Sequence, residues 1–127
     1  MNNYMPPQSI IEEKMREITE RGNYEMANLF SNEGLPIAEY CDEQLIDKDR
    51  LAELSILFRE IKKMADVMGK ISSIKEMIIE GYNRRKIVFR FFHAFNQDVV
   101  LALVVPPKKA YKGLTNSLVR IIEKISI

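Results

Sequence analysis

The residues that could perform chemistry in this chain are few, and their spacing matches no common reactive site. A loop that wraps nucleotide phosphates needs the pattern Gly-x-x-x-x-Gly-Lys-Ser/Thr. The single Gly-Lys pair is Gly69-Lys70, with Met64 at the position of the first glycine and Ile71 at the position of the hydroxyl residue. The sequence therefore argues against a nucleotide-hydrolysing P-loop.

Nucleophilic and metal chemistry are equally unsupported. His93 is the single histidine, and no serine or cysteine constellation surrounds it, so we interpret it as a partly buried strand residue. One His and one Cys, Cys41, cannot supply the ligands of a structural zinc site. Four acidic residues lie close together: Asp42, Glu43, Asp47 and Asp49. They lack the glycine and spacing of a calcium loop, and a solvated loop with Asp47 or Asp49 as a helix cap is the favoured interpretation.

Two further patterns leave alternatives open. The strand at 87–95 is aromatic and carries Arg90, so it could stack bases, but it lacks the glycine-aromatic pattern of RNA-binding sheets and is better interpreted as core. Arg84 and Arg85 are adjacent in a turn and could reach a partner's phosphate, although charged turn residues are ordinary. We expect no catalytic residue, no cofactor and no metal site in this chain.

Size and composition fit one ordinary globular domain. The chain has 127 residues, 46% hydrophobic and 29% charged, and 19 basic against 18 acidic residues leave a net charge of +1. This balance gives no bulk attraction to nucleic acid or anionic membranes. No secretory signal pattern opens the sequence, the longest apolar run at 99–107 is too short to span a bilayer, and one cysteine forms no internal disulfide. We expect a cytoplasmic protein that neither inserts into membranes nor binds nucleic acid.

The hydrophobic pattern predicts eight elements in the order α-β-β-α-β-β-β-α. After a flexible arm at 1–8, a single domain at 9–127 contains a helix at 9–22, strands at 24–31 and 36–40, a long helix at 49–68, strands at 74–80, 86–94 and 99–105, and a helix at 109–125. Ser9 and Glu12 form a predicted capping box, and residues 96–98 a predicted turn. The last strand is apolar on both faces, which is typical of a central strand. We expect an α+β fold with three layers, in which one long helix covers one face of a five-stranded antiparallel sheet and two helices cover the other.

The long helix has more apolar surface than one sheet face needs. Leucines, methionines and other apolar residues between Leu51 and Met68 fall on one face at helical spacing. A second strip, formed by Ala52, Ile56 and Val67, projects from the opposite side. Scattered exposed apolar residues are common, and that interpretation stays open for this strip.

Several segments resemble the roadblock/dynein light chain family. They are the hairpin text LFSNEGLPIA at 29–38, the leucine-rich long helix, the run IIEGY at 78–82, and the strand at 99–105 followed by a helix. The similarity covers roughly residues 8 to 126. It implies a profilin-like, roadblock-type sheet and a dimer in which the third strand pairs with its symmetry mate while the two long helices lie side by side.

The resemblance also implies a function. Members of this family commonly regulate small Ras-like GTPases without a conserved catalytic residue of their own. We therefore expect a homodimeric, non-catalytic regulator that binds a small GTPase and modulates its GTP hydrolysis. Its expected dimer interface comprises Ala52, Ile56, Val67, Ile74, Met77 and Ile79, since an apolar edge strand needs a partner. Its expected partner surface comprises Arg50, Glu53, Arg59, Lys62 and Lys63. The alternatives are a scaffold or adaptor subunit with no effect on nucleotide turnover, and a weaker option, a ligand-sensing domain.

Overall fold

The computed structural model describes residues 5–31, 33–41, 47–71 and 73–126. Most of the expected N-terminal arm, Asn32 of the first hairpin turn, and Asp42 and Glu43 of the acidic loop lie outside these residues. The predicted element order is confirmed. The elements are α1 (Pro7–Gly22), β1 (Met26–Phe30), β2 (Pro36–Cys41), α2 (Lys48–Met68), β3 (Glu76–Glu80), β4 (Lys86–Ala94), β5 (Gln97–Val105) and α3 (Lys112–Ile125).

The five strands form one antiparallel sheet in the order β2-β1-β5-β4-β3. β5 is central, and all seven residues of 99–105 are buried, as its two apolar faces predict. β2 and β3 are the edges. Pro36 begins β2 at one of these edges, where a missing backbone N–H costs nothing.

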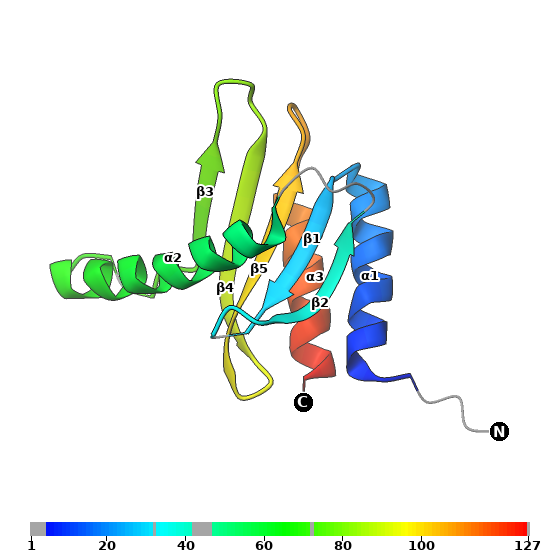
Figure 1. Cartoon of the computed structure of the whole chain (residues 1–127), viewed down its shortest axis with the longest axis horizontal. Coiled ribbons are helices and arrows are strands. Elements are labelled where there is room, and N and C mark those ends of the chain that lie inside the picture. Colours follow the sequence, from blue (N-terminus) through cyan, green and yellow to red (C-terminus); the bar gives the residue numbers. More distant parts are fainter. Residues whose placement is uncertain (1–4, 32, 42–46, 72, 127) are drawn as a thin grey trace.

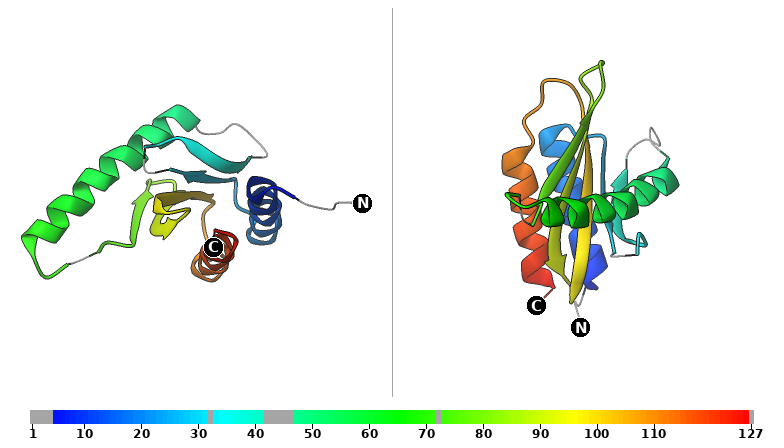
Figure 2. Two further views of the ribbon diagram at one scale, coloured as in Figure 1. Left: turned by 90° about the horizontal axis from the view of Figure 1, so that it is seen from below. Right: turned by 90° about the vertical axis from the view of Figure 1, so that its left-hand side faces the viewer.

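Three helices complete the layers (Figures 1 and 2). α1 and α3 cover one face of the sheet, and α2 crosses the strands on the other face. The first core contains Ile11, Met15, Ile18, Leu118 and Ile122 from the helices and Leu29, Leu101 and Leu103 from the sheet. The second core is smaller: Leu51 and Phe58 of α2 pack on Phe30, Phe89, Phe91, Val100 and Val104. Phe58 and Phe89 meet edge to face, with ring centroids 4.8 Å apart.

Local signals fix most helix ends. Asp47 caps α2, because its side-chain Oδ1 accepts hydrogen bonds from the backbone N–H groups of Asp49 and Arg50. Gly69 ends α2 with φ of +81°. The predicted capping box at Ser9 is wrong. α1 begins at Pro7 instead, since proline suits the first helical position, where its missing N–H is not needed.

The turn between β4 and β5 differs from the prediction. Phe95 and Asn96 both have positive φ, 55° and 58°, and form a two-residue connection, so the strand resumes at Gln97. This geometry matches the twist of the paired strands. The Phe95 ring packs against the α1/α3 core, which holds an aromatic residue in a conformation that asparagine or glycine usually adopts.

Tyr24 ties the start of β1 to the segment before α3, and this contact predicts an alkaline instability. Its hydroxyl donates to the carbonyl oxygen of Ala110 at 2.9 Å, and burial raises the pKa of the Tyr24 phenol. The phenol has a pKa of about 10 in the unfolded chain and a higher pKa in the folded protein. It therefore stabilises the fold fully at pH values below the unfolded-state pKa, and this stabilisation is lost as the pH rises through the folded-state pKa.

Tyr24→Phe is therefore expected to lower the free energy of unfolding by about 1 kcal/mol at neutral pH. As the pH rises above ~10, the variant should lose less stability than the wild type, because it has no phenol to ionise. Urea unfolding of both proteins across this pH range checks the result. A difference in the free energy of unfolding between the two proteins that stays constant with pH would contradict this expectation.

Candidate interaction surface

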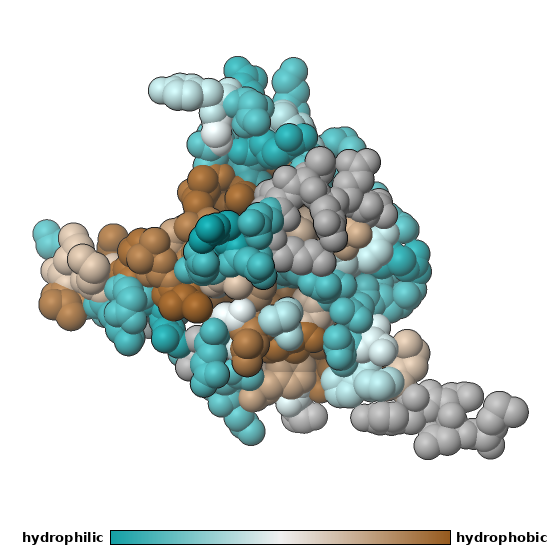
Figure 3. All heavy atoms as spheres, in the orientation of Figure 1, coloured by the Kyte–Doolittle hydropathy of each residue, from teal (hydrophilic) through white to brown (hydrophobic). Residues whose placement is uncertain are grey.

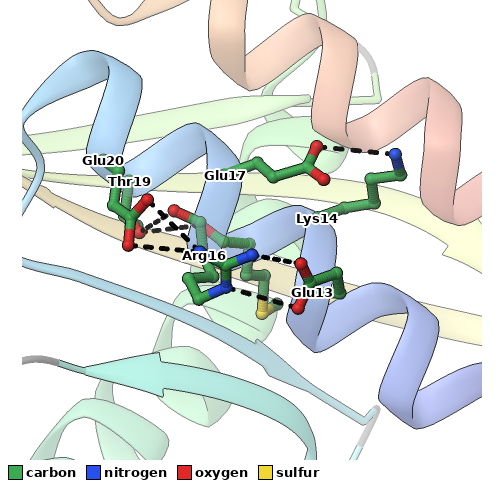
Figure 4. Close-up of polar contacts among 7 residues, drawn as sticks. Glu13, Lys14, Arg16, Glu17, Thr19 and Glu20 are labelled. Carbon is green, nitrogen blue, oxygen red and sulfur yellow. Dashed lines mark hydrogen bonds and ion pairs between the residues drawn. The ribbon is translucent and has the colours of Figure 1, made fainter.

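The outer face of α1 shows what a self-sufficient surface looks like in this protein. Arg16 lies between Glu13 and Glu20, and Lys14 pairs with Glu17 at 3.4 Å (Figure 4). The nearby Arg16 guanidinium lowers the pKa of the Glu13 carboxyl. Charges at i, i+3 and i, i+4 spacing satisfy one another along this helix. Among the described residues, α1 also exposes no large apolar side chain.

The face of α2 is different, because the helix is longer than the sheet is wide. Its 21 residues span about 31 Å, whereas five strands span about 19 Å between the outer two. α2 crosses the strands and runs past β3, and the chain then returns to β3 (Figures 1 and 2). The C-terminal part of α2 thus lies beyond the sheet of its own chain.

The overhanging part of α2 exposes large apolar side chains. Exposed fractions reach 66% for Met64, 87% for Val67 and 81% for Met68. Leu57 and Ile61 are also exposed, although their spacing placed them on the sheet-covering face. Hydrophobic residues accordingly gather along α2 and beside it on this side of the molecule (Figure 3). A contiguous patch of this kind is typical of an interface.

The six residues expected at a dimer interface lie on α2, on β3 or just before β3, and they differ in exposure. Ile56, Val67 and Ile79 are exposed. Ala52 and Met77 are half-buried and pack against the α2 core, and Ile74 is half-buried. Sequence reasoning missed Ile78, 42% exposed, because its side chain lies on the other face of β3.

The backbone of β3 is prepared to pair with another strand. Phe91 donates its N–H to the carbonyl of Lys75, and Gly81 donates its N–H to the carbonyl of Arg85. Antiparallel pairing alternates along the strand, so the N–H and C=O groups of Glu76, Ile78 and Glu80 point away from β4. These groups form an open edge.

The opposite edge of the sheet is already covered. The Glu12 carboxylate of α1 accepts a hydrogen bond from the backbone N–H of Glu39 in β2 at 3.0 Å, and Pro36 has no N–H to offer. Both features block the addition of a strand at β2. Of the two edges, β3 is the one that can accept a second chain.

A nearly buried charge network holds β3 in place. Arg90 of β4, 9% exposed, donates from Nη2 to Oε1 of Glu76 at 2.8 Å and from Nη1 to Oδ1 of Asn116 in α3 at 2.7 Å. The network links the edge strand to its neighbour and to the helix layer. Arg90 is thus a structural residue, so it is not available to a stacked base as the base-stacking alternative would require.

A polar hollow of about 480 Å³ runs along the other flank of α2. It is lined by Arg59, Lys62, Lys63, Asp66 and Asp98. The Lys62 ammonium lies 4.7 Å from the centre of the Phe91 ring, and Lys63 pairs with Glu60 at 3.4 Å. The structure brings three of the five expected partner-binding residues together here, with three cations against two carboxylates.

The other two expected partner-binding residues form a separate pair. Arg50 and Glu53 lie near the start of α2 and are bonded to each other at 2.8 Å, with both side chains more than 60% exposed. Exposed pairs of this kind contribute little to stability. Arg50 and Glu53 add charges at the N-terminal end of α2, and neither residue lines the hollow.

The described residues offer little chemistry. No group of three or more His, Cys, Asp or Glu residues that could hold a metal occurs among them, and no helix in that part of the chain is long and apolar enough to cross a bilayer. The prediction for His93 is wrong, because its side chain is 66% exposed and faces Asp98 at 3.4 Å. It lies one residue before the end of β4 and borders a hollow with Lys62 and Asp66 of α2.

This architecture is the roadblock-type fold, as solved structures show. MglB, a gliding protein of Thermus thermophilus, matches with a TM-score of 0.79 at 15% identity, over 97% of this chain and 93% of that chain. An MglB in a tetrameric arrangement matches with a TM-score of 0.72 at 17% identity, over 96% of this chain and 94% of that chain. The Roadblock/LC7 domain of Streptomyces avermitilis matches with a TM-score of 0.71 at 14% identity, over 90% of this chain and 92% of that chain.

These likenesses extend over nearly the whole chain, so the predicted fold is confirmed. No protein-family model and no curated protein matches the sequence. Identities of 14–17% support the shared fold alone. The tetrameric MglB shows that a protein of this fold assembles with other copies.

Proposed function

We propose that this chain is a non-catalytic, homodimeric regulator that binds a small Ras-like GTPase and modulates its GTP hydrolysis in the cytoplasm. The observation that carries the proposal is the exposed face of α2, where an apolar overhang lies beside a polar hollow lined by charges of both signs. Such a combination fits protein recognition better than catalysis, because desolvated apolar anchors supply affinity and the charges select the partner.

The dimer follows from the edge and the overhang taken together. Two β3 strands related by a two-fold axis would extend the sheet from five to ten strands. Each α2 would then reach over the neighbouring sheet, and the apolar residues of the overhang would lose their contact with water. A second copy thus accounts for both unpaired features at once.

The GTPase assignment rests on the resemblance to the roadblock family and on the fold shared with MglB. A regulator without reactive groups can still raise turnover by ordering the switch loops of the GTPase, so that the GTPase's own groups are positioned for hydrolysis. The hollow lined by Arg59, Lys62 and Lys63 offers the positive charge that an acidic partner would meet.

Reversing two charges on α2 tests this surface. Arg59→Glu combined with Lys63→Glu is expected to weaken binding about tenfold or more, since like charges would replace complementary ones. Binding is measured by titration against the Ras-like GTPases encoded in the same genome, beginning with any in a neighbouring gene. GTP hydrolysis is measured with and without this protein.

A matched control is available on α3. Arg120→Glu with Lys124→Glu makes the same changes at the same spacing in the opposite layer, and is expected to leave binding unchanged. Equal affinity of the α2 variant and the wild type would reject the proposed surface. Binding without any change in hydrolysis rate would instead favour a scaffold or adaptor role.

A further inference from the structure

The hairpin that joins β3 to β4 is a rigid, protruding element that the proposed surface does not include. Figure 1 shows its tip extending beyond the neighbouring ends of the sheet. Arg84 donates its N–H to the carbonyl of Gly81 at 2.9 Å, Gly81 donates to the carbonyl of Arg85 at 3.1 Å, and the Asn83 side chain accepts the N–H of Arg85 at 3.1 Å. Three hydrogen bonds within five residues define one turn conformation.

The tip is also fastened to the body of the domain. The Arg85 guanidinium pairs with Oε1 of Glu25 at 2.6 Å, and the Glu25 side chain is only 16% exposed. Glu25 precedes β1, so this ion pair reaches across the end of β5. The hairpin tip is therefore preorganised, and ordering it on binding would cost little entropy.

The tip exposes two side chains, Tyr82 and Arg84, of types that often anchor protein interfaces. Tyr82 is fully exposed, at 111% of its reference area. Arg84 is exposed and, within the part of the chain that the structure describes, makes no ion pair. Tyrosine and arginine are the residue types enriched at the energetic centres of protein interfaces. Among the described residues, neither side chain belongs to one of the two cores.

The backbone of Arg84 adopts a conformation that glycine adopts more readily. Its φ is +67°, in the left-handed region where glycine is the usual residue of such a turn. A side chain in this conformation strains the turn, as it does at Lys108, so glycine would relieve strain at either position.

We propose that Tyr82 and Arg84 form a preorganised contact for an acidic surface of the GTPase, placing Tyr82 in an apolar recess beside a carboxylate. The proposal rests on the proposed function and extends it beyond α2. β3 is the expected dimer edge, so each tip stands at one end of the joined strands, where a partner seated on the α2 layer can reach it. Within the described residues the Arg84 guanidinium has no ion-pair partner, so a carboxylate of the GTPase would complement its charge.

The sharpest test uses a variant whose two effects have opposite signs. Arg84→Gly is expected to raise the midpoint of thermal unfolding by roughly 3 °C, because it relieves the strained turn. The same variant is expected to weaken GTPase binding about tenfold, and more at low salt than at high salt. Tyr82→Ala is expected to weaken binding by a similar factor with little salt dependence.

Lys108→Gly is the matched control. Lys108 is an exposed cation with φ of +63° in the loop that leads to α3, so the change removes the same charge and relieves the same strain. It is expected to leave binding unchanged. If the wild type binds and both tip variants bind equally well, the tip proposal fails while the proposed function stands. If the wild type binds no GTPase, both fail.

Discussion

Val67→Glu is expected to convert the dimer into single chains. Val67 is 87% exposed, so within one chain the substitution disturbs almost no contact and should leave the unfolding midpoint of the monomer unchanged. In the proposed dimer the overhang of α2 is buried, and the two-fold axis would place two unpaired carboxylates in the interface. An unpaired buried charge costs several kcal/mol, so the dimer dissociation constant should rise about 100-fold or more.

Light scattering over a range of concentrations measures this effect. Met5→Glu is the control, because Met5 is 49% exposed and precedes α1, which lies on the other face of the sheet. It places the same charge on an exposed apolar position and should leave the dimer intact. A Val67→Glu protein that retains the mass of two chains would show that the α2 overhang is not buried between copies.

Breaking the Arg90–Glu76 pair is expected to cause the largest loss of fold stability by a charged residue. Arg90→Met leaves the Glu76 carboxylate, only 18% exposed, without its cation, and removes the link to Asn116. Loss of one partner of a largely buried pair costs about 3 kcal/mol, while replacing both partners by apolar residues costs much less. The double variant Arg90→Met, Glu76→Met should therefore recover most of the stability.

Urea unfolding at one fixed protein concentration measures the four proteins of this cycle. The Lys86–Glu80 pair serves as the control. It joins the same two strands at 3.3 Å, but Glu80 is 52% exposed, so Lys86→Met should cost less than about 1 kcal/mol. Equal losses from Arg90→Met and Lys86→Met would mean that burial does not strengthen the network.

Local patterns were sufficient to predict the fold. Alternation and turn residues define the strands, two-sided apolarity places β5 in the centre, and Asp47 is the observed one of the two expected caps of α2. Each of these signals acts over a few residues, whereas the role of β3 as an edge that pairs with a second copy came from the resemblance to the roadblock family. The turn at Phe95 was missed, because the conformation of that residue depends on packing against α1 and α3, which are distant in sequence.

The interaction surface was predictable only in part. Helical spacing identified Ile56 and Val67 as apolar residues on a second side, but spacing does not reveal how far the sheet extends below a helix. The exposure of Leu57, Ile61 and Met64 was therefore not predicted. Comparing the length of α2 with the width of five strands would have shown that the helix extends beyond the sheet.

The charged positions depended still more on tertiary structure. The sequence did not separate Arg90, which is held by groups 14 and 26 residues away, from the surface arginines. Arg59, Lys62 and Lys63 are neighbours because of their i, i+3 and i+4 spacing on α2, whereas Asp98 joins their hollow only through the folding of the sheet.

The proposed dimer depends on the pairing of two β3 strands, and a cross-link at Ile78 detects this pairing. Ile78 is the middle of the three outward-pointing residues of β3, so symmetric pairing places it opposite its own copy. Paired residues at such positions have Cα atoms about 5.5 Å apart, within the range of a disulfide. Ile78→Cys in a Cys41→Ser background should form a covalent dimer on mild oxidation. Leu35→Cys, although more exposed, should remain a single chain. Failure of Ile78→Cys to cross-link, with the wild type at the mass of one chain, would contradict the account.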